Sequence, residues 1–404
     1  MSHHIGDLIM EKNPGKAVPA NIILLSIVSF FNDLSSEMIM PILPMFLASL
    51  GSTGQVIGLV GGARDSITSI LLTLSGHWSD KTGKRKIFVY AGYATSAVFK
   101  LFLGLSKTWP VVVAVASLER TGKGLRTAAR DAIIADSMPA QRGKGFGIHR
   151  AIDTSGAILG SLGAFFLYWY LGFGFKFIIL TAAALSFVSL IPIIFVKESG
   201  QKPQKTSLSV SLKNLPPSLR LFIFVSAVFA LANFSYMFFI LRAKEFFSDR
   251  LSVAVPILLY VLFNLVYALF SVPLGAISDR IGRWKVIIFG YAVFVLICLR
   301  FAFFASLPTF IVLFALYGLS TAAIDGNQRA YVSDLATAHL KATALGTFHT
   351  ATGLMALPSG IIAGFLWEKI SPSGTFIYGA ALGFASVLLF IALKSYFRPQ
   401  PQAA

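Results

Sequence analysis

The chain has 404 residues, of which 56% are hydrophobic and 13% are charged, and its formal net charge is +17. Soluble globular proteins carry about a quarter charged residues, so this composition indicates an integral membrane protein and argues against a soluble one. The single cysteine, Cys298, excludes an internal disulfide and a cysteine-based metal cluster.

Twelve apolar segments, each long enough to cross a bilayer at about 20 residues, follow one another along the chain. They lie near residues 21–46, 54–74, 87–106, 110–135, 145–168, 174–196, 218–241, 252–273, 285–305, 308–333, 342–366 and 373–394. A polar stretch rich in Pro, Ser and Lys separates the sixth from the seventh. We therefore expect an all-α membrane protein with 12 transmembrane helices in two pseudo-symmetric six-helix bundles, at residues 1–197 and 218–404, joined by a cytoplasmic linker at residues 198–217.

Lys and Arg residues outside the segments are distributed unevenly. With the N-terminus placed in the cytoplasm, the termini and the even-numbered loops hold 19 of them and the other loops hold 6. Cytoplasmic loops carry such an excess, so we expect a multi-pass protein of the cell (plasma or inner) membrane with both termini in the cytoplasm. The basic net charge is then a signal of topology, and no nucleic-acid partner is expected.

The first segment contains two carboxylates within SFFNDLSSEMIMPILP, at residues 29–44. Four polar side chains share one side of this helix: Asn32, Asp33, Ser36 and Glu37. A charge that faced lipid would cost several kcal/mol, so we expect these four side chains to line a cavity between the two halves. Pro41 and Pro44 are expected to loosen the backbone of the outer half of the segment.

Two loops are copies of each other: GHWSDKTGKRK at residues 76–86 and GAISDRIGRWK at residues 275–285. At a constant offset of 199, Gly76, Asp80, Gly83 and Lys84 align with Gly275, Asp279, Gly282 and Arg283. A weaker pair is formed by RDAIIAD at residues 130–136 and QRAYVSD at residues 328–334. Such a duplication indicates two related bundles with a binding site between them.

Further charged residues fall inside the apolar segments, where they are expected to face an interior cavity or each other. The inward-facing set has seven basic residues, Arg64, Arg120, Lys123, Arg126, Arg130, Arg150 and Arg329, and seven acidic ones, Asp33, Glu37, Asp65, Glu119, Asp131, Asp153 and Asp325. Because the charges balance, this set favours neither an anionic nor a cationic ligand. Lys100 and Arg300 are expected near span ends, where long side chains reach the membrane surface.

Three motifs connect the sequence with a known family. Residues 76–85 fit the pattern G-x-x-x-D-[RK]-x-G-[RK]-[RK], and Trp284 replaces the last basic residue in the second copy. With the twelve segments and the central linker, these loops resemble the major facilitator superfamily over essentially the whole chain. Two motifs resemble its 12-span drug:proton antiporter branch, R-x-x-x-G-x-x-x-A at Arg120, Gly124 and Ala128, and the spacing G-x8-G-x3-G at Gly147, Gly156 and Gly160, where Ser161 replaces the proline that follows in the branch.

The resemblance implies the major facilitator fold and a secondary active transporter that works by alternating access, with proton-coupled export of a small organic compound. Glu37, directly before MIMPILP, is the first candidate for the proton-coupling site, and Asp33 is the second. The candidate substrate-cavity residues are Asn32, Ser36, Arg64, Asp65, Arg120, Arg150, Asp153, Asn233, Tyr236, Asp325, Gln328 and Arg329. The repeated loops of the family hold the cytoplasmic side shut in the outward-open state, which makes gating residues of Gly76, Asp80, Gly83, Arg85, Asp136, Asp279, Arg280, Gly282, Arg283 and Asp334.

Two alternatives remain. The first is a proton-coupled uptake symporter for a small metabolite or an organic anion, held by Arg120 and Arg150; the second is a receptor-like protein that senses without pumping. The sequence has no nucleotide-binding P-loop, zinc motif or nucleophile elbow. We therefore expect no enzymatic activity, no metal and no cofactor, with a proton gradient as the energy source. The expected partners are a small-molecule substrate, protons and the lipid bilayer, and the expected state is a monomer.

Overall fold

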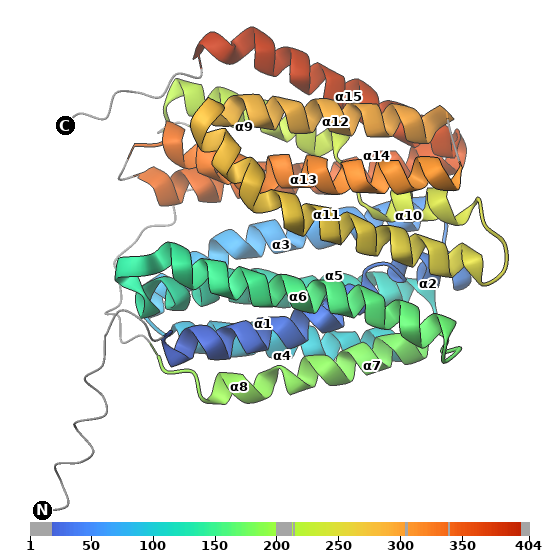
Figure 1. Cartoon of the computed structure of the whole chain (residues 1–404), viewed down its shortest axis with the longest axis horizontal. Helices are drawn as coiled ribbons and strands as arrows, with labels where there is room; N and C mark the ends of the chain where they lie inside the picture. Colours follow the sequence, from blue (N-terminus) through green and yellow to red (C-terminus); the bar gives the residue numbers. More distant parts are fainter. Residues whose placement is uncertain (1–17, 199–211, 213–214, 304–305, 338–339, 397–404) are drawn as a thin grey trace, which may run out of the picture.

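The computed structural model describes residues 18–198, 212, 215–303, 306–337 and 340–396, and every regular element in this part of the chain is a helix (Figure 1). The helices are α1 (Ala20–Ile39), α2 (Leu43–Ser49), α3 (Gly54–Thr82), α4 (Arg85–Leu105), α5 (Trp109–Ser137), η1 (Pro139–Gln141), α6 (Arg142–Trp169), α7 (Phe175–Val188), α8 (Leu190–Ile194), α9 (Pro217–Ala232), α10 (Met237–Lys244), α11 (Leu251–Ile281), α12 (Arg283–Phe303), α13 (Leu307–Leu335), α14 (Lys341–Lys369), α15 (Pro372–Leu393) and η3 (Lys394–Tyr396).

Eleven helical stretches of the described residues are long and apolar enough to cross a membrane. Three of them are pairs of consecutive helices: α1 with α2, α7 with α8, and α9 with α10. Helix α5 has 29 residues but is not among the eleven. It carries Glu119, Arg120, Lys123 and Arg126 along its middle. The structure is therefore that of a multi-pass helical membrane protein with eleven candidate spans, and α5 takes the place of the expected fourth one.

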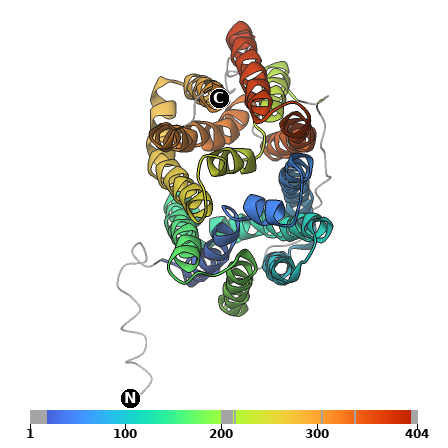
Figure 2. The same cartoon turned by 90° about the vertical axis from the view of Figure 1, so that its right-hand side faces the viewer.

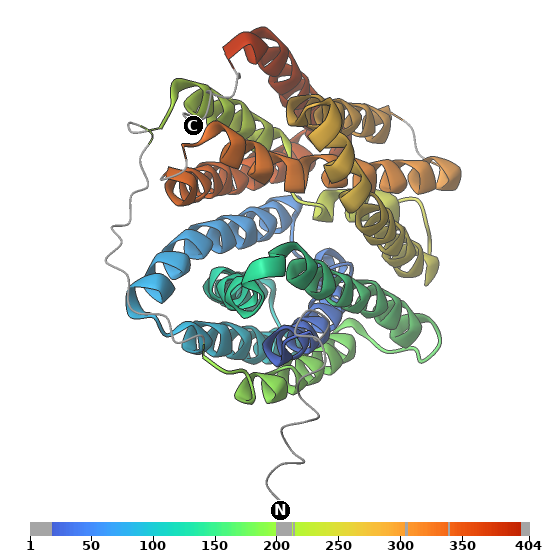
Figure 3. The ribbon, with the colours of Figure 1, turned by 60° about the vertical axis from the view of Figure 1, so that its left-hand side comes forward.

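The helices form two bundles that lie one above the other in Figure 1, with α1–α8 in the lower bundle and α9–α15 in the upper one. The end-on view of Figure 2 shows the same two groups. The bundles pack against each other mainly through α3 with α14 and α6 with α11, and Figure 3 shows α3, in light blue, beside the upper bundle. Of the expected linker, residues 199–211 and 213–214 lie outside the described residues.

Close packing between helices depends on glycine. A Cβ atom on Gly360 of α14 would lie 2.2 Å from the backbone oxygen of Gly58 in α3. In the same way, Cβ atoms on Gly156 and Gly160 of α6 would lie 2.4 and 2.2 Å from backbone oxygens of α1. Since helices in lipid associate largely through such small-residue contacts, the first seam joins the two bundles and the second places α1 against α6.

Two candidate spans are interrupted near their middle. Between α1 and α2 the break falls at residues 40–42, where Pro41 cannot donate a backbone hydrogen bond to the preceding turn. Between α9 and α10 it falls at residues 233–236, without a proline. Asn233 and Tyr236 therefore lie at the break of the seventh span, which corresponds to residues 40–42 of the first span.

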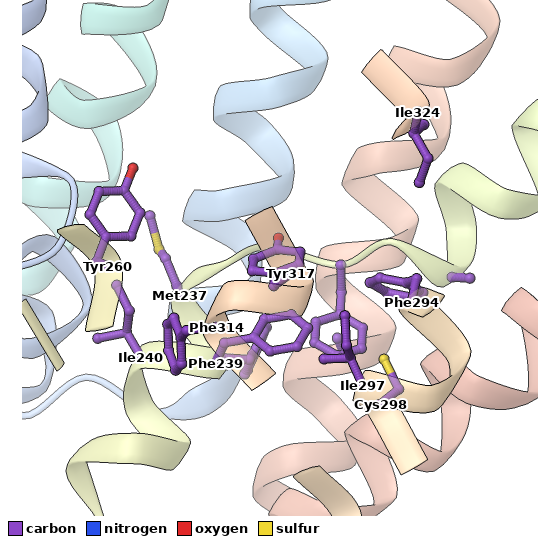
Figure 4. Packing of buried hydrophobic residues seen from close by; sticks show 14 of the residues in the cluster. Met237, Phe239, Ile240, Tyr260, Phe294, Ile297, Cys298, Phe314, Tyr317 and Ile324 are labelled. Carbon is purple, nitrogen blue, oxygen red and sulfur yellow. The ribbon is translucent and has the colours of Figure 1, made fainter. Parts of the chain in front are cut away.

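Aromatic rings dominate the core of the second bundle (Figure 4). Phe239 of α10 stacks on Tyr317 of α13 with ring centroids 4.6 Å apart, and it meets Phe301 of α12 edge-on at 5.0 Å. Cys298 is fully buried in the same core. These ring contacts therefore pack α10, α12 and α13 against one another.

Candidate functional site

A cavity of about 740 Å³ lies between the bundles, lined by α1, α5 and α6 on one side and by α11 and α13 on the other. It extends from Glu37, in the middle of the molecule, to Asp279 and Arg283 at the α11–α12 junction. Its volume is in the range of small-molecule sites, roughly 300–1,000 Å³. The molecule is thus open at the end that carries the repeated loops.

At the opposite end the bundles are closed on each other. The backbone N–H of Gly54 donates to Glu368 Oε2 at 2.9 Å. Arg250 donates to the backbone oxygens of Tyr168 and Trp169 at 3.0 and 2.8 Å. All three hydrogen bonds join residues of different bundles, so the cavity is accessible from one side of the molecule.

Glu37 lies at the deep end of the cavity and connects the bundles. Its Oε2 accepts hydrogen bonds from the Tyr260 hydroxyl at 2.9 Å and from Asn264 Nδ2 at 3.2 Å, both on α11. These donors belong to a polar stripe on α11, spaced by four, three and four residues: Tyr260, Asn264, Tyr267 and Ser271. This stripe was not predicted from the sequence, although an asparagine within an apolar helix is a usable signal.

Asp33, one turn before Glu37, also lines the cavity. Asp153 on α6 lines the same cavity and lies within electrostatic range of the Asp33 carboxyl group. Arg150 Nη1 is 3.5 Å from Asp153 Oδ2, whereas Asp153 Oδ1 is buried and has no hydrogen-bond partner among the described residues. Two carboxyl groups, one from α1 and one from α6, therefore line this cavity.

The basic residues of α5 differ in their partners. Arg126 donates to Ser96 Oγ at 2.8 Å and lies over the Tyr93 ring, and Arg130 pairs with Asp131 at 2.9 Å. The Lys123 side chain is exposed to the cavity, and its ammonium group makes no hydrogen bond or ion pair with any described residue. One ammonium group is thus available to a bound solute.

Nearer the mouth, a polar chain crosses between the bundles. Arg150 of α6 donates to the Tyr267 hydroxyl at 2.9 Å, and that hydroxyl donates to Asp325 Oδ2 of α13 at 3.0 Å. Arg329 is 3.9 Å from the same carboxylate. The structure therefore brings together Arg150, Asp153, Asp325 and Arg329 of the expected cavity residues, and all four line the cavity.

Other expected cavity residues form a separate, buried cluster beyond Glu37. Arg64 and Arg120 are only 5% and 7% exposed, and both contact the Glu119 carboxylate, at 3.6 and 3.4 Å. Both also point at the sulfur of Met40, at 3.4 and 2.8 Å, and Tyr236 donates to the Met40 backbone oxygen at 3.0 Å. In this conformation Arg64, Arg120 and Tyr236 do not line the cavity, and neither do Asp65, Asn233 and Gln328.

Asn32 and Ser36 lie away from the cavity as well, because they surround Lys100 of α4. Lys100 Nζ donates to Ser36 Oγ at 2.8 Å and Ser35 Oγ at 3.0 Å, with Asn32 and Ser186 oxygens at 3.4 Å. Lys100 is 1% exposed, so the expectation that it reaches the membrane surface was wrong. The polar side of α1 is divided: two carboxylates face the cavity, and the uncharged residues bind a buried ammonium.

The repeated loops form matching ion-pair clusters. Arg85 pairs with Asp136 and with Asp80, the latter at 3.2 Å. Arg283 pairs with Asp334 and with Asp279, the latter at 2.9 Å. Arg283 is therefore the counterpart of Arg85, whereas the constant offset had aligned it with Lys84. Among the described residues, none of these ion pairs joins the two bundles.

The glycines of these loops have structural roles. Gly83 and Gly282 end α3 and α11 with φ of +67° and +103°, a region that disfavours residues with a Cβ. A Cβ on Gly76 would lie 3.3 Å from Ala128 Cβ on α5. Arg280 is exposed. The loop geometry thus places each arginine where it can reach an aspartate at the end of a neighbouring helix.

Comparison with known proteins identifies the family. The family model of the Major Facilitator Superfamily matches residues 25–256 and 245–404. The uncharacterised MFS-type transporter MJ1317 of Methanocaldococcus jannaschii is 52% identical over 97% of this chain and 100% of its own length. The chain belongs to the major facilitator superfamily. It is a transporter of this superfamily, and the fold class expected from the sequence is confirmed in that coarser form.

More distant similarities are of two kinds. The multidrug resistance protein MdtG of Salmonella arizonae is 27% identical over 68% of this transporter and 70% of its own length. Crystal structures of the nucleoside transporter NupG (D323A mutant) and of the POT family transporter PepTSo superpose with TM-scores of 0.78 each, at 17% and 13% identity. They cover 94% of this transporter and 100% and 98% of their own chains. The structural matches show a shared fold, and they carry nothing about the substrate.

Proposed function

We propose that this transporter exports a small organic compound in exchange for protons, by alternating access, with Glu37 as the proton-coupling residue. One observation carries the proposal: at the deep end of a cavity open on one side, a carboxylate of one bundle accepts two hydrogen bonds from the other bundle. The sequence similarity to MdtG, a multidrug resistance protein, supports export over uptake.

The coupling works through the strength of those two hydrogen bonds. Hydrogen bonds to a charged group contribute about 1.5–3 kcal/mol, against about 0.5–1.5 kcal/mol for neutral pairs. Ionised Glu37 therefore holds α1 against α11 and stabilises the present arrangement. Protonation weakens both bonds and allows the bundles to rock towards the opposite opening. The excess of Lys and Arg in the loops around the mouth supports a cytoplasmic mouth, so protons are released there.

Asp33, the second candidate, provides a further proton-binding position one turn from Glu37. A cationic group that enters the cavity stabilises the ionised forms of both carboxylates and displaces the proton. Competition between substrate and proton for the same carboxylates produces exchange without direct contact between the two. Asp33→Asn is expected to weaken this exchange while leaving the hydrogen bonds of Glu37 intact.

Flux in proteoliposomes tests the proposal. Compounds first selected by binding are offered under a proton gradient of either direction. Protons that flow out of the acidic compartment drive an exchanged compound into it, so antiport accumulates the compound on the acidic side and symport on the alkaline side. Glu37→Gln is expected to lose accumulation driven by the gradient and to retain passive exchange of labelled for unlabelled compound. Accumulation on the alkaline side, or a Glu37→Gln protein that responds to the gradient as the wild type does, contradicts the proposal.

A further inference from the structure

We infer that the exported compound is a hydrophilic zwitterion, with a cationic group bound by the carboxylates at the deep end of the cavity and an acidic group bound by Lys123. This inference rests on the proposed transport function and specifies its substrate class. The inference depends on which charged groups of the cavity are already neutralised by the protein and which are left for a ligand.

At the mouth, the charges neutralise each other. Four arginines each pair with a carboxylate of their own bundle, in the pairs Arg130–Asp131, Arg150–Asp153, Arg283–Asp279 and Arg329–Asp325. A fifth arginine, Arg126, is held by a hydroxyl group and an aromatic face. A solute that passes the mouth therefore meets ion pairs whose charges are largely compensated.

At the deep end, three charges remain uncompensated. Asp33 and Glu37 form no ion pair with a described residue, and neither does Lys123. Lys123 lies within electrostatic range of both carboxylates but more than the 4.0 Å of an ion pair from either. A gap of this kind between opposite charges fits a ligand that carries both signs and bridges them.

A buried acceptor marks the position for the cationic group. Asp153 is 7% exposed and lines the cavity, and its Oδ1 has no hydrogen-bond partner among the described residues. An unsatisfied buried acceptor costs about 1–3 kcal/mol, and an ammonium group of a ligand, seated between Asp153 and Asp33, removes that cost. Lys123 then remains for a carboxylate or phosphonate at the other end of the same molecule.

The lining also argues against a lipophilic substrate. Of the described residues around the cavity, half are charged, and the hydrophobic side chains other than the Tyr267 ring are Phe146, Ala157 and Ala322. Drug-sized lipophilic ligands gain affinity by burying apolar area against apolar walls. Here such a ligand would strip water from charged groups without replacing their hydrogen bonds, which is unfavourable.

A binding panel tests the inference on the full-length protein in detergent. The panel contains the common amino acids and aminophosphonates, together with matched analogues that lack one group: leucine, for example, with isoamylamine and 4-methylpentanoate. Thermal stabilisation and direct affinity are measured for each. We expect stabilisation by zwitterions and at least about tenfold weaker binding of each analogue, as for the loss of one hydrogen bond between charged groups.

Lys123 provides the specific variant. In Lys123→Gln the affinity for the zwitterion should fall at least about tenfold, while the affinity for the matched amine should not change. Lys123→Arg should restore the preference for the zwitterion over the amine. Lys107→Gln, at an exposed lysine outside the cavity, is the control for a general loss of charge. Because the Lys123 ammonium group bonds to no described residue, and the hydrogen bond from Thr127 Oγ1 goes to the backbone oxygen, replacement of the side chain is expected to leave the fold intact.

The outcomes separate this inference from the proposed function. Binding by no zwitterion, or equal loss of amine and zwitterion in Lys123→Gln, overturns the inference. If ethidium, a lipophilic cation, is driven by the proton gradient and zwitterions are not, the antiport proposal stands and the substrate class is wrong. If zwitterions bind with the expected Lys123 dependence but no gradient moves them, the substrate class stands and the proton coupling is wrong.

Discussion

Lys100 illustrates how strongly single residues are constrained inside this molecule. Its ammonium group is surrounded by oxygens of Asn32, Ser35, Ser36 and Ser186. A buried charge is tolerated only when it is well solvated by protein groups. Here the oxygens come from α1 and α7, so Lys100 connects both helices to α4. These hydrogen bonds also fix the rotation of α1 about its axis, which directs Asp33 and Glu37 into the cavity.

Replacing this lysine should therefore destabilise the first bundle. Lys100→Met keeps the approximate length and apolar stem but leaves the hydroxyl groups without their donor, at an expected cost of about 2 kcal/mol. The apparent melting temperature of the purified protein measures the effect, with Lys107→Met as an exposed control. A Lys100→Met protein that melts at or above the wild-type temperature would show that Lys100 does not fasten α1.

At the scale of elements, the closed end depends on the contact of α3 with α14. Gly360 and Gly58 allow the two backbones to approach so closely that one added methyl group would overlap a carbonyl oxygen. Since the bundles close by bringing these helices together, the seam stabilises the conformation in which the cavity is open at the opposite end. The ion-pair clusters of Arg85 and Arg283 stay within their own bundles and leave the mouth free.

Gly360→Ala is expected to separate α3 from α14 and to shift the population away from the conformation described here. A cysteine at Gln55, next to the seam, should then react faster with a membrane-impermeant maleimide added from the outside. Gly143→Ala, at a position where an added Cβ meets nothing within 4 Å, is the matched control. Equal labelling rates in both variants would show that the seam does not hold the outer end closed.

Local sequence signals predicted some elements better than others. Apolar runs predicted the eleven candidate spans, together with a fourth segment that is not among them. Pro41 and Pro44 indicated a weak point in the first span, where α1 ends and α2 begins. The break between α9 and α10 has no proline, so it left no comparable signal. Asp33 and Glu37 were found because a carboxylate in an apolar helix needs an aqueous or polar partner.

The remaining parts of the site depend on partners far apart in the sequence. Asn32 and Ser36 share a helix side with the carboxylates, and only the position of Lys100 on α4 decides that they turn away from the cavity. Arg64 and Arg120 were expected in the cavity, but both contact the sulfur of Met40, at the break after α1. Long-range packing of this kind cannot be read from helical periodicity.

On the scale of the whole molecule, the proposed mechanism assigns one opening to one protonation state of Glu37. The mouth is open while Glu37 accepts hydrogen bonds from α11, and the far end is closed by contacts between the bundles. Acidification should protonate Glu37, weaken its hold on α11 and narrow the mouth. We therefore expect the mouth of the cavity to be wide in alkaline solution and narrow in acidic solution.

The distance across the mouth measures this directly. Spin labels at Lys144→Cys and Ile281→Cys, both exposed positions at mouth-side ends of α6 and α11, can be placed in a Cys298→Ala background because the chain has a single cysteine. Double electron–electron resonance in lipid nanodiscs should show a long distance at alkaline pH, a shorter one at acidic pH, and the shorter one at both pH values in Glu37→Gln. A distance distribution that changes neither with pH nor with Glu37→Gln would contradict the coupling of this carboxylate to the opening of the transporter.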